Sequence, residues 1–244
     1  MPVIYLSPST QEFNPYNGGG NEEQYMNLIA DAMEPYLAAS GIRYVRNTPD
    51  MTAATSIAAS NQGNYDLHLA LHSNATGSGD GSARGSEVYY YPTSEKGKRF
   101  ADIAAENLQL IYPLPARVRT VPTTSLGEVR RVKAPGVLIE IAYHDNAEDA
   151  QWIRDNIEAI AANLVLSLTE YFSIPFNTPQ PIFTANVATK GSNLNIRYNP
   201  STEAAIVGSI PNGAEVVVYA QLPDWTLVGY GDTVGYVSSR YIQF

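Results

Sequence analysis

The stretch PGVLIEIAYHDN, residues 135–146, contains the pattern that decides the fold of the N-terminal part of the chain. Within it, Val137–Ile141 is a short apolar run bounded by Pro-Gly and by polar residues, which is typical of a strand buried in a sheet. Only Glu140 interrupts the run. Because burying an unpaired charge is costly, a buried Glu140 needs a metal ion, a histidine or a proton as its partner. It is therefore a candidate active-site carboxylate, unless it lies on an edge strand and faces water.

On both sides of this strand, strand-like and helix-like segments alternate. Strand-like runs cover residues 3–6, 42–46, 67–71 and 87–91, and helix-like segments cover residues 22–39, 51–61, 96–111 and 147–172. In the first helix, apolar residues such as Met26, Ile29 and Met33 recur at steps of three and four. The alternation predicts an α/β fold, with a layered, mostly parallel or mixed sheet flanked by helices.

The C-terminal part has a different pattern. The stretch SIPFNTPQPI, residues 173–182, contains three prolines and predicts a short, stiff linker. Short β-type runs follow at 194–197, 205–210, 215–219, 225–230 and 235–237, separated by turn signals such as Pro223-Asp224. We therefore expect an α/β domain over residues 1–174, a Pro-rich linker over 175–183 and a small all-β barrel over 184–244.

The composition excludes several classes of function. The 244 residues contain 15 Lys and Arg against 24 Asp and Glu, so that the net charge is −9 and a nucleic-acid partner is not expected. The absence of cysteine excludes disulfides, thiolate catalysis and Cys-ligated zinc. No run approaches the ~18–20 apolar residues of a membrane span, so membrane insertion is not expected. No signal-peptide pattern opens the sequence, which predicts synthesis in the cytoplasm or a leader that is not recorded.

The strand DLHLALHSNA, residues 66–75, carries two of the three histidines. His68 and His72 point to the same face but lie about 13 Å apart along an extended strand, so they cannot bind one metal ion together unless the strand ends between them. His72 is predicted where the strand opens into a loop, at the sheet edge where ligands of α/β proteins bind. His68 lies deeper, and we expect it to be a hydrogen-bonded structural residue.

Glu22 is the third candidate active-site residue, after Glu140 and His72. It opens the first helix on the same face as Met26, so its carboxylate is either an inward-pointing metal ligand or a first-turn residue that favours the helix dipole. Together with His72 and Glu140 it suits a zinc hydrolase, in which nitrogen and oxygen ligands leave a position for water and a further glutamate takes the proton of that water.

Four pieces in this order resemble the zinc-dependent N-acetylmuramoyl-L-alanine amidases of the amidase-3 family. They are IYLSPSTQ (4–11), NEEQYMNLIADAMEPYLAASGI (21–42), DLHLALHSNA (66–75) with GSEVYYY (85–91), and PGVLIEIAYHDNAEDAQWI (135–153). The resemblance covers about residues 3–172. It implies that Glu22 and His72 are zinc ligands and that Glu140 is the catalytic glutamate.

One position departs from the family pattern. The family has a zinc-binding histidine near Thr10, and this chain has Gln11 as the nearest substitute. Three alternatives follow: Gln11 coordinates zinc through its carbonyl oxygen, Gln11 holds a zinc-bound water, or His144 supplies a nitrogen instead. We expect Gln11 to be the third ligand. We expect His144 to lie in a loop above the sheet and to contact the substrate.

Residues 184–244 resemble a bacterial SH3-type domain. The pieces that carry the resemblance are LNIRYNPST (194–202), IVGSIPNGAEVVVY (206–219) and DWTLVGYGDTVGYVSSRYI (224–242). In similar enzymes this module binds the bacterial cell wall, which implies peptidoglycan as the partner.

The two resemblances imply a peptidoglycan hydrolase that cleaves the amide between N-acetylmuramic acid and L-alanine of the stem peptide. It would act on the wall either as an endolysin released from the cytoplasm or as a secreted autolysin. The alternative is a catalytically weak or inactive wall-binding protein with the same fold, because the first histidine is missing. A cysteine peptidase carrying an SH3-type module is excluded by the absence of cysteine.

Overall fold

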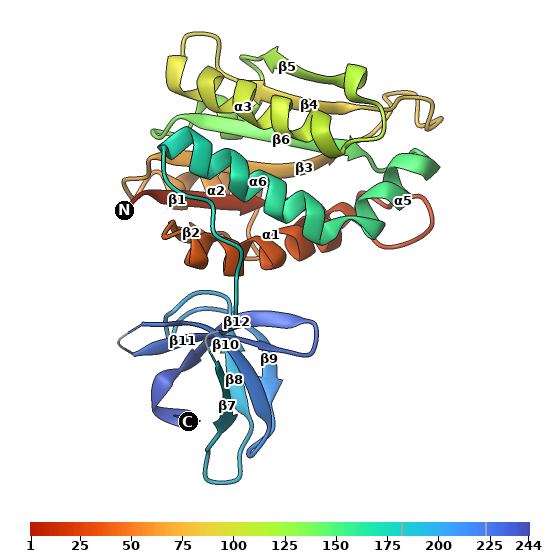
Figure 1. The fold of residues 1–244 in the computed structure, drawn as a ribbon. Coiled ribbons are helices and arrows are strands. Elements are labelled where there is room, and N and C mark those ends of the chain that lie inside the picture. The colour runs from red at the N-terminus through yellow and green to blue at the C-terminus, as the bar shows by residue number, and fades with distance from the viewer. Residues whose placement is uncertain (182, 223) are drawn as a thin grey trace. The chain divides into compact units, whose positions relative to one another are not determined.

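The computed structural model describes residues 1–181, 183–222 and 224–244, and it contains two sheets (Figure 1). The chain divides into two compact units, one formed by residues 1–33 and 42–176 and the other by residues 34–41 and 177–244. Position 182 of the predicted linker and Pro223 of the predicted Pro223-Asp224 turn lie outside the described residues. The helices formed by the described residues include none that is both long and apolar enough to cross a membrane.

The first unit is built on a six-stranded sheet with the strand order β2-β1-β3-β6-β4-β5. Its strands are β1 (Val3–Pro8), β2 (Arg43–Arg46), β3 (Leu67–Asn74), β4 (Ser86–Tyr90), β5 (Val118–Pro122) and β6 (Gly136–Tyr143). The first four strands of that order are parallel, and β4 pairs with β6 in the antiparallel direction. The sheet is therefore mixed, and the predicted α/β class is confirmed.

Helices cover both faces of this sheet. They are α1 (Glu22–Ala39), α2 (Ala53–Ser60), α3 (Glu95–Ile111), α4 (Gly127–Arg130), α5 (Ala147–Asp155) and α6 (Ile157–Phe172), with a 3₁₀ turn η1 (Pro115–Arg117). In Figure 1, α3 and α6 lie side by side in front of the sheet. On the opposite face, Val129 of α4 packs against Ala70 and Leu138. Because side chains alternate along a strand, His72 and Glu140 point to this same α4 face.

Four elements of the first unit differ from the sequence-based expectation. β3 continues to Asn74, so His72 lies inside the strand and not at the start of the loop. The predicted helix over 147–172 is two helices, because the backbone of Asn156 leaves the helical region at φ −126°. β5 and α4 were not predicted, because the first is a five-residue, partly exposed edge strand and the second has only four residues.

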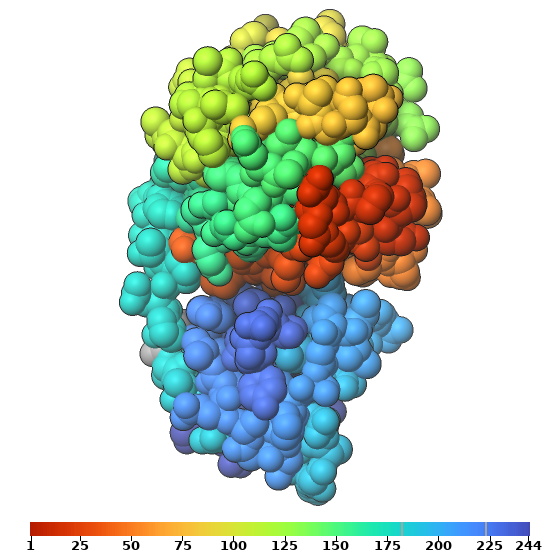
Figure 2. All heavy atoms as spheres, turned by 90° about the vertical axis from the view of Figure 1, so that its right-hand side faces the viewer, coloured from red at the N-terminus to blue at the C-terminus, as the bar shows by residue number. Residues whose placement is uncertain are grey.

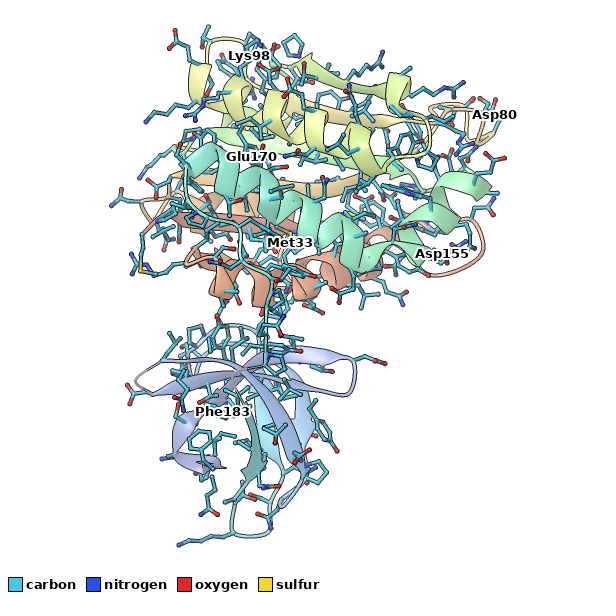
Figure 3. The ribbon with its side chains drawn as sticks, in the orientation of Figure 1. Met33, Asp80, Lys98, Asp155, Glu170 and Phe183 are labelled. Carbon is cyan, nitrogen blue, oxygen red and sulfur yellow. The ribbon has the colours of Figure 1, made fainter. Side chains whose placement is uncertain are left out.

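The loops at the carboxyl ends of β1, β3 and β6 form one edge of the sheet. Figure 3 labels two residues of this edge: Asp80 in the loop between β3 and β4, and Asp155 at the end of α5. The loop after β1 reaches α5, where Arg154 Nη1 donates to the carbonyl of Asn17 over 2.7 Å. In Figure 2 these segments adjoin as red and green spheres. Segments far apart in the sequence thus meet at this edge.

The second unit contains a seven-stranded antiparallel sheet with the order β13-β7-β10-β11-β12-β8-β9. Its strands are β7 (Phe183–Val187), β8 (Leu194–Arg197), β9 (Ile206–Ile210), β10 (Glu215–Gln221), β11 (Trp225–Tyr230), β12 (Thr233–Ser238) and β13 (Ile242–Gln243), with a 3₁₀ turn η2 (Ser239–Tyr241). Its core includes Val187, Ile196, Val218, Val228 and Val237. The predicted small all-β unit is confirmed, while β7 and β13 were not predicted.

Candidate active site

The loop after β1 brings Gln11 to the start of α1. The backbone N–H of Ser9 donates to the carbonyl of Leu71 over 2.9 Å, which continues the pairing with β3 beyond the end of β1. The chain then turns back on itself, and the N–H of Glu22 donates to the carbonyl of Asn14 over 3.0 Å. This turn uses Gly18, Gly19 and Gly20 at positive φ. Gln11 and Glu22, which are eleven positions apart in the sequence, therefore lie at one site.

Three side chains with metal-ligand chemistry converge at this point. His72 Nδ1 lies 2.8 Å from Glu22 Oε1 and 3.2 Å from Gln11 Nε2. Asn14 holds two of them in place, since its Nδ2 donates to Glu22 Oε2 over 2.6 Å and to Gln11 Oε1 over 3.3 Å. The structure thus brings together the three predicted metal ligands, although their role as ligands stays a prediction.

Glu128 is a member of this cluster that the sequence analysis missed. It lies on the short helix α4, and its Oε2 is 3.1 Å from His72 Nε2 while its Oε1 is 3.3 Å from His68 Nε2. The Ser7 hydroxyl also donates to Glu128 Oε1 over 2.5 Å. In the sequence, Glu128 is marked only by the Val129 that follows it, a short distance before the buried strand. Two residues are too short a pattern to identify a helix.

His72 is thus held between two carboxylates. Burial lowers the pKa of His72, but its hydrogen bonds to Glu128 and Glu22 outweigh this effect and raise the pKa well above the ordinary value. Burial likewise raises the pKa of Glu22, and hydrogen bonds to His72 and Asn14 more than reverse the change, so that the pKa is lowered. Two carboxylates facing one imidazole make this a site for positive charge.

His68 touches this cluster through Glu128, but its contacts are those of a structural residue. It is fully buried, its Nδ1 lies 2.9 Å from the Ser60 hydroxyl, and its ring stacks on Tyr5 at a centroid distance of 5.3 Å. These contacts agree with the structural role expected for it. One carboxylate, that of Glu128, bridges it to His72.

Glu140 lies beside His72 in the sheet. The two residues are paired in the register of β3 and β6, so that their side chains stand on the same face of neighbouring strands. The Oε2 atom of Glu140 is buried and has no hydrogen-bond partner among the described residues. Burial, aided by the negative charges of Glu22 and Glu87 and opposed by His72, raises the pKa of Glu140 to about 7. A carboxylate in this state can take up and release a proton near neutral pH.

His144 lies in the turn that follows β6. It is buried, with its Nδ1 2.8 Å from the carbonyl of Ser73 and its ring stacked on Tyr16. Its backbone carbonyl accepts from the N–H of Asn17 over 2.8 Å. The structure therefore places His144 under the loop that carries Gln11, and its contact with substrate stays a prediction.

The donor set fits a zinc ion. Among the described residues, no cluster of three His, Cys, Asp or Glu side chains is arranged to hold a metal. Of the three predicted ligands, Glu22 and His72 are of these types, and the third is the Gln11 amide, which offers either oxygen or nitrogen after a half-turn of its end group. One imidazole nitrogen and two oxygens are ligands that zinc accepts. Glu128 on the second nitrogen of His72 provides the carboxylate that commonly orients a metal-binding imidazole.

Comparison with known families agrees with this geometry. Residues 10–170 match the model of the N-acetylmuramoyl-L-alanine amidase family. The chain belongs to this family. Residues 192–243 match the model of the bacterial SH3 domain. Both resemblances noted in the sequence are thereby confirmed.

Individual relatives give the same picture. The chain is 35% identical over 150 residues to N-acetylmuramoyl-L-alanine amidase LytC of Bacillus subtilis (strain 168), which is 57% of this chain and 29% of LytC. The chain thus spans less than a third of that curated relative.

Solved structures share the fold of the first unit. The N-acetylmuramoyl-L-alanine amidase AmiC2 of Nostoc punctiforme superposes with a TM-score of 0.62 at 17% identity, over 70% of this chain and 97% of that one. The catalytic domain of the CD27L endolysin targeting Clostridia difficile superposes with a TM-score of 0.58 at 22% identity, over 70% and 98% of the two chains.

Proposed function

We propose that this protein is a peptidoglycan amidase that hydrolyses the amide between the lactyl group of N-acetylmuramic acid and L-alanine of the stem peptide. The observation that carries the proposal is the pairing of His72 with Glu140 in the sheet register, next to the Glu22 and Gln11 donors, in a member of the amidase family. A carboxylate with a pKa of about 7 then stands beside a set of metal donors.

The proposed chemistry needs a zinc ion held by Glu22, His72 and the Gln11 amide. When bound, zinc polarises the scissile carbonyl and acidifies the attacking water. In this proposal Glu140 would accept the proton of this water and pass it to the leaving amine of L-alanine. Gln11 and His72, together with Glu128, line a cavity of about 270 Å³ that gives access to the cluster.

The second unit is proposed to attach the enzyme to the cell wall. It contains a cavity of about 430 Å³ whose lining includes Trp225, Tyr241, Arg197 and Arg240. Aromatic faces and guanidinium groups suit the sugars and carboxylates of peptidoglycan. The protein would therefore act on the wall, either as an endolysin or as an autolysin.

The proposal is tested by digesting purified peptidoglycan with the full chain, with and without a chelator, and analysing the products by mass spectrometry. We expect chelator-sensitive release of stem peptides with a free L-alanine amine and no new reducing sugar ends. New reducing ends would indicate a glycosidase, and release that a chelator does not reduce would contradict the role of the metal.

The second candidate function is a wall-binding protein without useful activity. The observation that favours it is Gln11 at the position where the family has a histidine, because an amide is a weaker zinc ligand than imidazole. Absence of cleavage with zinc added in excess, while the chain still sediments with cell walls, would decide for this candidate.

A further inference from the structure

A row of side chains continues from Glu140 toward the far edge of the sheet. In the antiparallel register Glu140 of β6 faces Glu87 of β4, and Glu87 in turn faces Arg119 of β5. Directly paired residues stand on the same face of a sheet, so this row lies on the α4 face with His72. At a spacing of about 4.8 Å per strand, Arg119 begins roughly 10 Å from Glu140.

The guanidinium of Arg119 is hydrogen-bonded to Glu87 on one side and exposed to solvent on the other. Its Nε donates to Glu87 Oε1 over 2.9 Å, and its Nη2 contacts the same oxygen. Glu87 Oε2 accepts from Asn74 Nδ2 over 3.2 Å and from the Tyr89 hydroxyl. The Arg119 side chain is nevertheless 69% exposed, and a guanidinium carries five N–H donors. Donors therefore remain for a ligand in a group whose position is fixed.

This guanidinium lines a cavity of about 370 Å³ together with Arg84, Arg117, Glu87 and Tyr143. Arg84 is engaged by Asp149, with its Nε 2.8 Å from Oδ1, and also contacts Glu148. Arg117 is exposed, and no ion pair is recorded for it among the described residues. Glu87 pairs with Arg119, and two carboxylates of α5 pair with Arg84. Among the described residues, Arg117 is therefore the guanidinium of this cavity whose charge no carboxylate neutralises. A guanidinium without an ion pair attracts anions.

We propose that this cavity binds a carboxylate of the substrate, the one carried by the second amino acid of the stem peptide. The inference rests on the proposed amidase function. An extended peptide advances about 3.3–3.6 Å per residue, so a carboxylate two residues beyond the scissile amide lies roughly 7–10 Å from it. This distance matches the roughly 10 Å that separate Glu140 from Arg119 across the sheet. The carboxylate accepts hydrogen bonds from Arg119 and Arg117, while Glu87 holds Arg119 in the required orientation.

The test compares two ligands that differ in one group. They are N-acetylmuramoyl-L-alanyl-D-glutamate and its isoglutamine form, in which a neutral amide replaces the α-carboxylate. Binding is measured by calorimetry to the full-length Glu140→Gln protein, so that neither ligand is consumed. We expect the amide to bind about tenfold more weakly, since a charge-assisted bidentate contact is lost. We also expect added salt to reduce the difference.

Substitutions then locate the contact. Arg117→Ala and Arg119→Ala, each made in the Glu140→Gln chain, are expected to abolish the preference for the carboxylate. Arg43→Ala is the matched control, because Arg43 is an exposed arginine on β2 at the opposite edge of the same sheet. Arg119→Ala leaves Glu87 without its cation and can unfold the domain, whereas Arg117→Ala removes no recorded partner of a buried group.

Equal binding of the two ligands overturns the inference, as does a preference that survives both substitutions or a failure of either ligand to bind. These outcomes are independent of the proposed function, which is decided by what the unmodified chain does to peptidoglycan. An active amidase that does not distinguish the two ligands would keep the function and remove the subsite.

Discussion

Nε2 of His72 lies 3.1 Å from Oε2 of Glu128, on the side of the ring opposite to Glu22. The two nitrogens of this imidazole thus have separate tasks. Nδ1 faces the donors of the proposed metal site, while Nε2 is held by a carboxylate on another element of the fold. A proton on Nε2 leaves Nδ1 free to bind a metal, so Glu128 selects the useful tautomer and fixes the plane of the ring.

The first prediction concerns this contact. Glu128→Gln should weaken zinc binding by about 10–100-fold, because such outer carboxylates orient the ligand and increase its basicity. Zinc affinity is measured by competition with a chromophoric chelator. Glu158→Gln, an exposed position on α6, is the control. Unchanged affinity in Glu128→Gln would show that His72 needs no support from α4.

The second prediction separates metal binding from proton transfer. Glu140→Ala should abolish the release of stem peptides and leave zinc bound, because Glu140 stands beside the donor set and not within it. His72→Ala should lose both zinc and activity. Zinc content of the purified variants is measured by elemental analysis, and activity is measured on peptidoglycan. Near-normal turnover by Glu140→Ala would refute the proposed mechanism.

The third prediction concerns the residue that departs from the family pattern. Replacing Gln11 by histidine should raise zinc affinity by about tenfold, since imidazole is the stronger ligand, and Gln11→Ala should lower it. Gln24→Ala, exposed on α1, is the control. If neither change at Gln11 alters the affinity, the third ligand lies elsewhere and His144 becomes the group to test.

The fourth prediction follows from the raised pKa of Glu140. Burial raises the pKa to about 7 in the folded chain, so ionising Glu140 costs stability as the pH rises from about 4.5 through 7. In chelated protein, Glu140→Gln should therefore increase the free energy of unfolding by about 3 kcal/mol at pH 8 and have little effect at pH 4.

Denaturant titrations at the two pH values check this expectation. Glu106→Gln, at an exposed position of α3, serves as the control and should have little effect at either pH. A gain of equal size at pH 4 and pH 8 would assign the effect to packing rather than to the charge.

Much of the site could be predicted because its residues lie in strong local patterns. Glu140 interrupts a buried apolar run, and Glu22 opens a long amphipathic helix, so each is conspicuous in its own segment. Glu128 has no such context: it lies on a four-residue helix after an exposed loop, and only the folding of α4 onto β3 and β6 gives it a partner. The function of Glu128 depends on a long-range contact, which periodicity does not reveal.

The same reason explains the elements that were missed. β5 and β7 are five-residue strands in which only alternate or single residues are buried, so the apolar signal is weak. The arginine row depends on the register of β5 against β4, which no pattern within either segment fixes. Sequence periodicity predicts the layers of the fold, whereas strand pairing decides which side chains meet across them.

The fifth prediction concerns the second unit. Anionic polymers of a bacterial wall repel a chain of net charge −9, so attachment requires specific contacts from residues 184–244. We expect the full chain to sediment with cell walls and residues 1–180 alone to bind at least tenfold less.

Substitutions at the cavity of this unit test where the contact lies. Trp225→Ala, in the cavity lining, should reduce sedimentation, whereas Leu222→Ala, at an exposed apolar residue absent from that lining, should not. Equal sedimentation of residues 1–180 and the full chain would mean that the amidase unit finds the wall by itself.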